Sequence, residues 1–159
     1  GVNLKWGVPT LIETDSLGNA APPHVAVDPS GNAIAVWHQS NGTVDNIWAN
    51  RFDGVNLKWG VATLIERDNV GHAHRPHVAV DKSGNAMVVW SQSDGTRDNI
   101  LASQFDRVSL QWGTPTPVEM DNSGKAGSPQ VVVDPSGNVI AVWSQSDGKH
   151  SNIWANRFE

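Results

Sequence analysis

The chain alternates short runs of small, apolar or β-branched residues with clusters of Gly, Asn, Asp and Pro, and no segment keeps the spacing of an amphipathic helix. The clearest piece spans residues 24–37, where two apolar runs flank Asp28-Pro29-Ser30-Gly31-Asn32. Pro29 presets the first corner of a turn, and Gly31 supplies the left-handed position that closes it. The pattern predicts a hairpin of two buried strands at 24–28 and 32–38.

Two further strands are predicted after this hairpin. Asn41-Gly42 is a strong turn signal, and residues 46–52 then alternate as a half-exposed strand does. Residues 55–66 alternate with more polar positions, which indicates an outer strand. The unit is therefore four antiparallel strands, apolar inside and polar outside, preceded by a loop at 14–23.

The whole pattern occurs three times. Residues 1–53, 54–106 and 107–159 align without a gap, and together they form a single repeat domain. A fixed period of this length indicates an architecture built from equal units. Catalytic sites usually need unequal residues, whereas nearly every candidate residue here occurs in three copies. The repetition therefore predicts that the chain is not an enzyme.

Four-stranded antiparallel units of this kind are typical of β-propeller blades. The run Val25-Ala26-Val27-Asp28, followed by Gly31-Asn32 and later by Phe52-Asp53-Gly54, resembles the bacterial NHL-type propeller repeat. The resemblance implies an all-β propeller with three blades per chain and says little about function. A β-trefoil also has three four-stranded repeats and is the alternative fold, although its Gln-x-Trp signature does not occur here.

The strands predicted at the two ends of the chain suggest how chains assemble. The chain opens with a predicted outer strand, Leu4 to Glu13, and closes with a predicted third strand, Asn152 to Phe158. Propellers typically have 4–8 blades, and unpaired strand edges promote aggregation. We therefore expect strand exchange to close the ring as a homodimer with six blades. A trimer with nine blades and a fragment of a longer array are the alternatives.

Composition narrows the partners. The net charge of −5 and the scattered Lys and Arg residues provide no basic patch for nucleic acid or an anionic membrane. The chain has no cysteine, so it cannot form disulfides. A natural protein of this kind is expected outside the cell or on a bacterial surface. The close likeness of the repeats and the start at Gly1 equally suit an engineered or trimmed symmetric propeller fragment without a ligand.

Eight tryptophans and repeated polar loop residues suggest carbohydrate binding, because sugar rings stack on indoles and their hydroxyls bind to polar side chains. Several weak sites in one assembly would add avidity, as in a lectin. The competing interpretation is that these residues pack between blades and bond to loop backbone. The predicted ligand-binding residues are Trp6, Trp59 and Trp112; Asp15, Asp68 and Asp121; Gln39, Gln92 and Gln145; and Asn46, Asn99 and Asn152.

Other repeated or clustered residues receive structural interpretations. Trp37, Trp90 and Trp143 end a buried strand and are predicted to lie in the core. Histidine clusters can bind zinc, but His72, His74 and His77 crowd together in the second repeat only. We therefore predict no metal site and no cofactor. The three aspartates that precede the first turn of each repeat are predicted to be turn formers: Asp28, Asp81 and Asp134.

Overall fold

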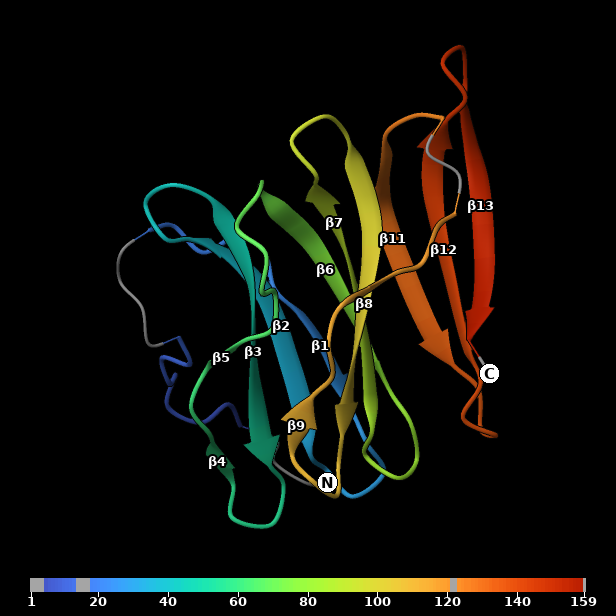
Figure 1. Cartoon of the computed structure of the whole chain (residues 1–159). Coiled ribbons are helices and arrows are strands. Elements are labelled where there is room, and N and C mark those ends of the chain that lie inside the picture. Colours follow the sequence, from blue (N-terminus) through green and yellow to red (C-terminus); the bar gives the residue numbers. More distant parts are fainter. Residues whose placement is uncertain (1–4, 14–17, 121–122, 159) are drawn as a thin grey trace.

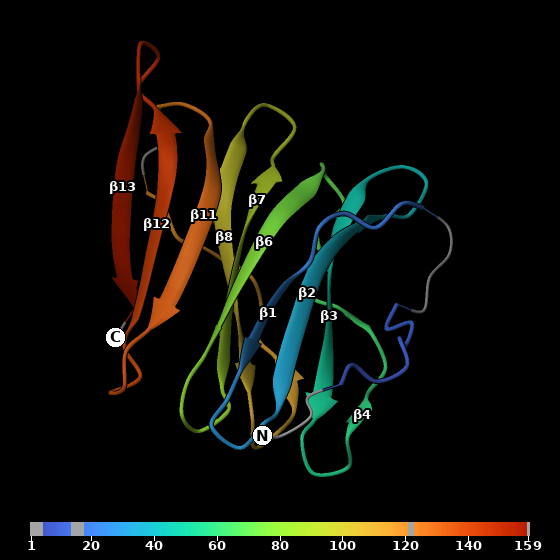
Figure 2. The ribbon, with the colours of Figure 1, turned by 180° about the vertical axis from the view of Figure 1, so that it is seen from behind.

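The computed structural model describes residues 5–13, 18–120 and 123–158. In this part of the chain all regular structure is β-strand, arranged in three antiparallel sheets that stand side by side (Figures 1 and 2). Each sheet takes its three long strands from one repeat, and the first two sheets gain their short outer strands from the start of the next repeat, as expected for the blades of a β-propeller. The propeller prediction is confirmed, and the trefoil alternative is wrong.

The first two sheets have five strands each and the third has three. The first sheet comprises β1 (His24–Val27), β2 (Ala33–Ser40), β3 (Asp45–Asp53), β4 (Lys58–Trp59) and β5 (Thr63–Leu64). The second comprises β6 (Ala73–Val80), β7 (Ala86–Ser93), β8 (Asp98–Asp106), β9 (Gln111–Trp112) and β10 (Thr116–Pro117). The third comprises β11 (Ala126–Val133), β12 (Val139–Ser146) and β13 (Ser151–Phe158).

The outer strand differs from its prediction. Residues 55–66 form two short strands, β4 and β5, which both pair with β3 on either side of an unpaired stretch. The corresponding segment of the first repeat forms no strand over residues 5–13, and Leu4 lies outside the described residues. A strand needs a partner edge, and β13, the edge that matches this segment, belongs to the last repeat of the chain.

The inner strand is longer than predicted in the second and third repeats. It begins at Ala73 and Ala126 and passes through a register shift where Arg75 and Ser128 have φ values of 55° and 53°. In the first repeat only the isolated bridge between Ala20 and Gln39 remains of this extension. Pro22 stands at the position of Arg75 there and has no N–H to donate.

Two apolar clusters hold the three sheets together. One joins the first and second sheets, and the other joins the second and third. Trp37, Trp90 and Trp143 are 3%, 0% and 4% exposed, so their predicted place in the core is confirmed. The prediction that both strands of the first hairpin are buried is wrong for β1, because Val25 and Val27 are exposed.

The aspartate turns are confirmed. Asp28 Oδ1 accepts hydrogen bonds from the backbone N–H of Ser30 at 2.8 Å and of Asn32 at 3.0 Å. The same pair of bonds is made by Asp81 and by Asp134. A further bond from the Asn138 side chain helps to hold the pKa of Asp134 below its usual value. These carboxylates therefore serve the turns at the lower edge of the sheets in Figure 1.

Candidate functional site

The edge opposite these turns carries the polar residues that the sequence analysis singled out. The β2–β3, β7–β8 and β12–β13 turns lie there, together with the starts of β6 and β11 (Figure 1); we call it the upper edge. In each repeat the segment that leads into the inner strand passes close to the end of the second strand, and a glycine makes this close approach possible. A Cβ on Gly71 would lie 2.7 Å from both the Cβ and the carbonyl oxygen of Ser93, and one on Gly18 would lie 2.5 Å from the Ser40 oxygen.

A buried chain of hydrogen bonds lies beneath the upper edge. Trp90 Nε1 donates to Gln92 Oε1 at 2.8 Å, and Gln92 Nε2 donates to Glu66 Oε1 at 3.1 Å. The third repeat matches it, with Trp143, Gln145 and Glu119 linked at 2.9 Å in both bonds. In the first repeat Trp37 donates to Gln39 at 3.0 Å.

The three predicted glutamine ligands are therefore buried. Gln39, Gln92 and Gln145 are 1%, 4% and 2% exposed. Each accepts from the indole of the tryptophan two residues earlier, and Gln92 also donates to the Asp68 carbonyl at 2.7 Å. This placement favours the structural interpretation of the glutamine column, in which it ties the incoming segment to the sheet.

The glutamates of this network were not among the residues predicted from the sequence. Glu66 is 1% exposed, and burial raises its pKa, although bonds from Gln92 and the Asp68 backbone oppose the shift. Among the described residues nothing bonds to its Oε2. One feature of the sequence does indicate them: a glutamate follows Ile12, Ile65 and Val118, at the end of each predicted outer strand.

The asparagine column lies directly opposite the glutamine column. Gln39 pairs with Asn46 across β2 and β3, and the other two repeats keep this register. Asn99 and Asn152 each donate 3.0 Å bonds to the aspartate of the neighbouring turn, Asp94 and Asp147. The glutamine and asparagine columns thus lie together at one edge, and ligand binding by them stays a prediction.

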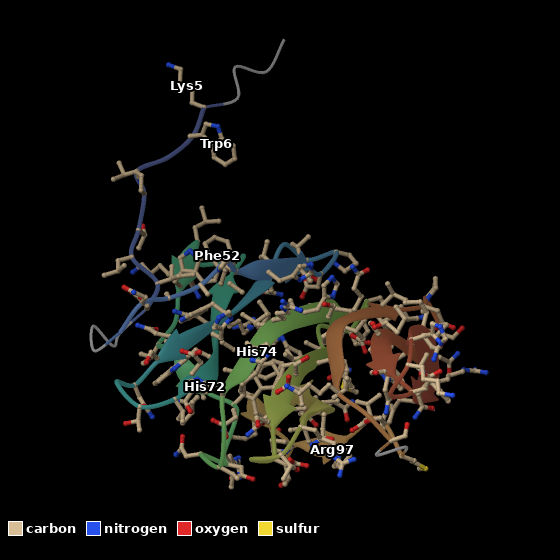
Figure 3. The ribbon with its side chains drawn as sticks, turned by 90° about the horizontal axis from the view of Figure 1, so that it is seen from above. Lys5, Trp6, Phe52, His72, His74 and Arg97 are labelled. Carbon is tan, nitrogen blue, oxygen red and sulfur yellow. The ribbon has the colours of Figure 1, made fainter. Side chains whose placement is uncertain are left out.

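The remaining predicted ligands do not join this group. Trp59 and Trp112 lie toward the lower end of the sheets, against Phe52 and Phe105 at ring distances of 5.4 and 5.2 Å. Trp6 is fully exposed on a segment that projects away from the sheets (Figure 3). Asp68 is exposed at the upper edge, where its Oδ1 accepts from Val70 N at 3.0 Å. Asp15 and Asp121 lie outside the described residues.

A second polar group lies at the upper edge between the first two sheets, with two of its members exposed and three half-buried. We call it the upper-edge cluster: His38, Asp45, His72, His74 and Arg75. His72 Nδ1 lies 3.1 Å from Asp45 Oδ2 and 3.2 Å from Asp45 N. A neutral ring can accept from the amide, and a protonated one can donate to the carboxylate. The cluster therefore offers both donors and acceptors to a ligand.

The other cluster members are held by packing and by one bond to the third sheet. The rings of His38 and His74 meet edge to face at 6.4 Å, and burial is the main cause that lowers both pKa values. Asp45 opposes the shift at His38 and Asp98 opposes it at His74. Arg75 Nη1 donates to Ser128 Oγ at 2.8 Å. The lowered pKa values favour the neutral rings of His38 and His74, which lie beside the Arg75 guanidinium.

Two further histidines tie neighbouring sheets together. His24 Nδ1 accepts from Val78 N at 3.2 Å, and His77 Nδ1 accepts from Val131 N at 3.3 Å. The two rings lie 3.6 Å apart, and burial lowers the pKa of each. His77, which the sequence placed in one cluster with His72 and His74, is therefore engaged with the next inner strand.

The described residues offer no metal centre. No group of three or more His, Cys, Asp or Glu side chains within this part of the chain is arranged to hold an ion. No helix in the described ranges is long and apolar enough to cross a membrane.

Comparison with solved structures supports the propeller architecture. Neither a family model nor a curated protein matches the chain. Among similar structures, an endo-arabinase from Bacteroides thetaiotaomicron superposes with a TM-score of 0.59 at 17% identity over 96% of this chain and 60% of that one. A thermostable family-43 glycoside hydrolase gives a TM-score of 0.57 at 18% identity, over 88% of this chain and 55% of that one.

An α-L-arabinanase from Penicillium chrysogenum, solved with arabinobiose, gives a TM-score of 0.55 at 12% identity over 84% of this chain. The present chain covers 44% of that enzyme. The chain thus spans about half the length of the propellers that it matches. These likenesses establish the fold class as β-propeller, and no more than the fold follows from such low identities.

Two predictions need correction. The expectation that the chain is not an enzyme is contradicted, because the matching structures are glycoside hydrolases. A repeated scaffold does not prevent unequal residues from meeting at one edge, as His74 and Arg75 show by standing where the third repeat has Gly127 and Ser128. The resemblance to the NHL-type repeat and the count of three blades also gain no support from these matches.

Proposed function

We propose that this chain is part of a carbohydrate-binding β-propeller and that the upper-edge cluster contributes to its glycan site. The observation that carries the proposal is the fold match to propellers that act on arabinan, including one solved with arabinobiose. A further matching structure comes from a family of mannoside phosphorylases that contains glycoside hydrolases acting on β-1,2 mannosidic linkages.

The chemistry of the cluster supports this assignment. Sugar hydroxyls both donate and accept hydrogen bonds, so they suit neutral imidazole, carboxylate and guanidinium groups set close together. His72 and Arg75 are exposed, and Asp45 is partly exposed, so all three can be reached from solvent. The fixed bond from Arg75 to Ser128 orients one donor before a ligand arrives, which reduces the cost of binding.

The test is a binding and turnover measurement on the same glycans. The chain is titrated with arabinobiose, longer arabino-oligosaccharides and a β-1,2-linked mannobiose by calorimetry and by amide NMR. The proposal predicts saturable binding with shifts at 72–75. Release of reducing ends from arabinan, measured in parallel, would make the site hydrolytic.

Variants copied from the chain itself provide the control. Arg75→Ser introduces the residue of the third repeat and should weaken glycan binding about tenfold or more, because a charged donor is lost. Arg97→His introduces the third-repeat residue at the β7–β8 turn, outside the cluster, and should leave binding unchanged. The absence of binding to all three glycans would favour a propeller without a carbohydrate ligand.

A further inference from the structure

The two ends of the row of sheets are uncovered in complementary ways. On the third sheet Ile153 is 80% exposed, whereas its equivalents Ile47 and Ile100 are 0% exposed because the next sheet packs over them. On the first sheet Val25 is 59% exposed, whereas Val78 and Val131 are 2% exposed under the preceding sheet. Each end therefore presents the face that the other end lacks.

The outer edge of the third sheet is open in the same way. β13 pairs only with β12 among the described residues, while β3 and β8 carry outer strands on their other side. In the second and third repeats the residues equivalent to 5–13 form those outer strands. In the first repeat this segment projects into solvent, with Lys5 and Trp6 far from the sheets (Figure 3). Asn50 Nδ2 bonds to Ile12 O at 2.8 Å, as Asn156 Nδ2 bonds to Val118 O at 2.8 Å.

This last equivalence shows the direction of the segment. The residues just before Val118 form the outer strand of the second sheet, and Val118 then contacts the third sheet. Ile12 contacts the first sheet in the same way, so residues 5–11 are placed to form the outer strand of a sheet that precedes the first. We propose that the preceding sheet is the third sheet of a second copy of this chain. The segment 5–12 adds to β13 of that copy, and the first sheet packs on its open face.

The register follows from the two pairings within the chain. Phe52 pairs with Trp59 and Phe105 with Trp112, so Phe158 pairs with Trp6 of the second copy. Ala49 pairs with Thr63 and Ala102 with Thr116, so Ala155 pairs with Thr10. Ile65 N donates to Ile47 O at 3.0 Å and Val118 N to Ile100 O at 2.8 Å, so Ile12 N donates to Ile153 O.

The Trp6 indole of a second copy has a matching place beside a space between the second and third sheets. A space of about 290 Å³ lies between the second and third sheets, lined in part by Met87, Ala102, Val139 and Phe158. The equivalent space between the first and second sheets is lined by Ile34, Ala49 and Phe105 and also by Trp112, which packs on the apolar cluster there. In the assembly, Trp6 of a second copy takes the place beside the third sheet that Trp112 takes beside the second.

The first experiment measures mass against concentration by sedimentation velocity. The chain should associate to about two or three times its 17.1 kDa, as six or nine blades require. Trp6→Ala removes the indole that packs against Phe158 at this space, and Ile153→Asp places a charge on the open face. Because both side chains are exposed in the single chain, each variant should fold and should associate at least about tenfold more weakly.

Val8→Thr is the matched control. Its second-repeat equivalent, Val61, stays exposed in the completed first sheet, and Thr114 occupies the position in the third repeat. This variant should associate as the parent chain does. A parent chain that stays monomeric throughout, or a Trp6→Ala chain that associates normally, would overturn the proposal.

A disulfide tests the register, because the chain contains no other cysteine. A Thr10→Cys chain mixed with an Ala155→Cys chain should form a disulfide-linked pair with one of each, since paired residues bring their Cα atoms within about 5.5 Å. A Thr63→Cys and Ala49→Cys chain is the positive control within one molecule. Equal yield from Val8→Cys with Ala155→Cys would contradict the register. The result is independent of glycan binding.

Discussion

At the scale of single residues, the molecule uses histidine as an acceptor between sheets. His24 and His77 each receive a backbone N–H through Nδ1, which requires the neutral ring. The third repeat has Gln130 in the same column, and its amide oxygen can accept without titrating. The chain therefore contains its own replacement for both histidines.

The first prediction follows from the lowered pKa of these two histidines. Below the ordinary histidine pKa of about 6.5, the unfolded chain takes up protons that the folded chain excludes, because burial lowers the pKa of His24 and His77 in the folded state. The free energy of unfolding therefore falls with falling pH. A chain with His24→Gln and His77→Gln should lose less stability between pH 8 and pH 5. Urea unfolding of both chains at the two pH values measures this.

Other titrating groups act equally in both chains and cancel in the comparison. His38 and His74 add the same sign of pH dependence, and Glu66, with its raised pKa, opposes it. Equal losses in the parent and the double variant would refute the role assigned to His24 and His77.

At the scale of elements, sequence pattern predicted the strands where one repeat supplies all that a strand needs. The hairpin around Asp28 and the third strand appear close to their predicted bounds, because local turn chemistry and alternation fix them. The outer strand of the first repeat could not be predicted correctly, because its formation depends on a partner edge elsewhere. The extension of β6 through Arg75 depends likewise on a backbone conformation with positive φ that the sequence does not signal.

The candidate site was predictable only in part. The repeated glutamine and asparagine columns did gather at one edge, since residues that face each other across a hairpin must. Whether they are buried depends on the segment that crosses from the previous sheet, which brings Glu66 and Asp68 over Gln92. No pattern within one repeat contains that contact.

The second prediction concerns this crossing. Gln92→Met keeps the side-chain volume but leaves Trp90 Nε1 and the Glu66 carboxylate without their shared partner. Unpaired buried polar groups cost about 1–3 kcal/mol each, so the free energy of unfolding should fall by about that amount or more. Gln111→Met, at an exposed position of β9, should change it little. Denaturant unfolding of the two variants compares them, and equal stability would indicate that Gln92 is not structural.

At the scale of the whole molecule, stability should depend on concentration. If the exposed end faces are covered only in an assembly, association stabilises the folded state by mass action. The melting temperature should therefore rise with protein concentration for the parent chain and for Val8→Thr. For Ile153→Asp it should stay constant. Calorimetric scans over a wide concentration range measure this, and a constant parent value would contradict it.

The unlike end faces have a consequence for how such chains can change in length. Since every repeat presents the same pair of faces, removing or duplicating a whole 53-residue unit leaves the faces at both termini as they were. The end faces are therefore the same whatever the number of repeats. The size of a closed assembly is then set by the angle between adjacent sheets, and a gene could gain or lose copies without having to invent a new contact.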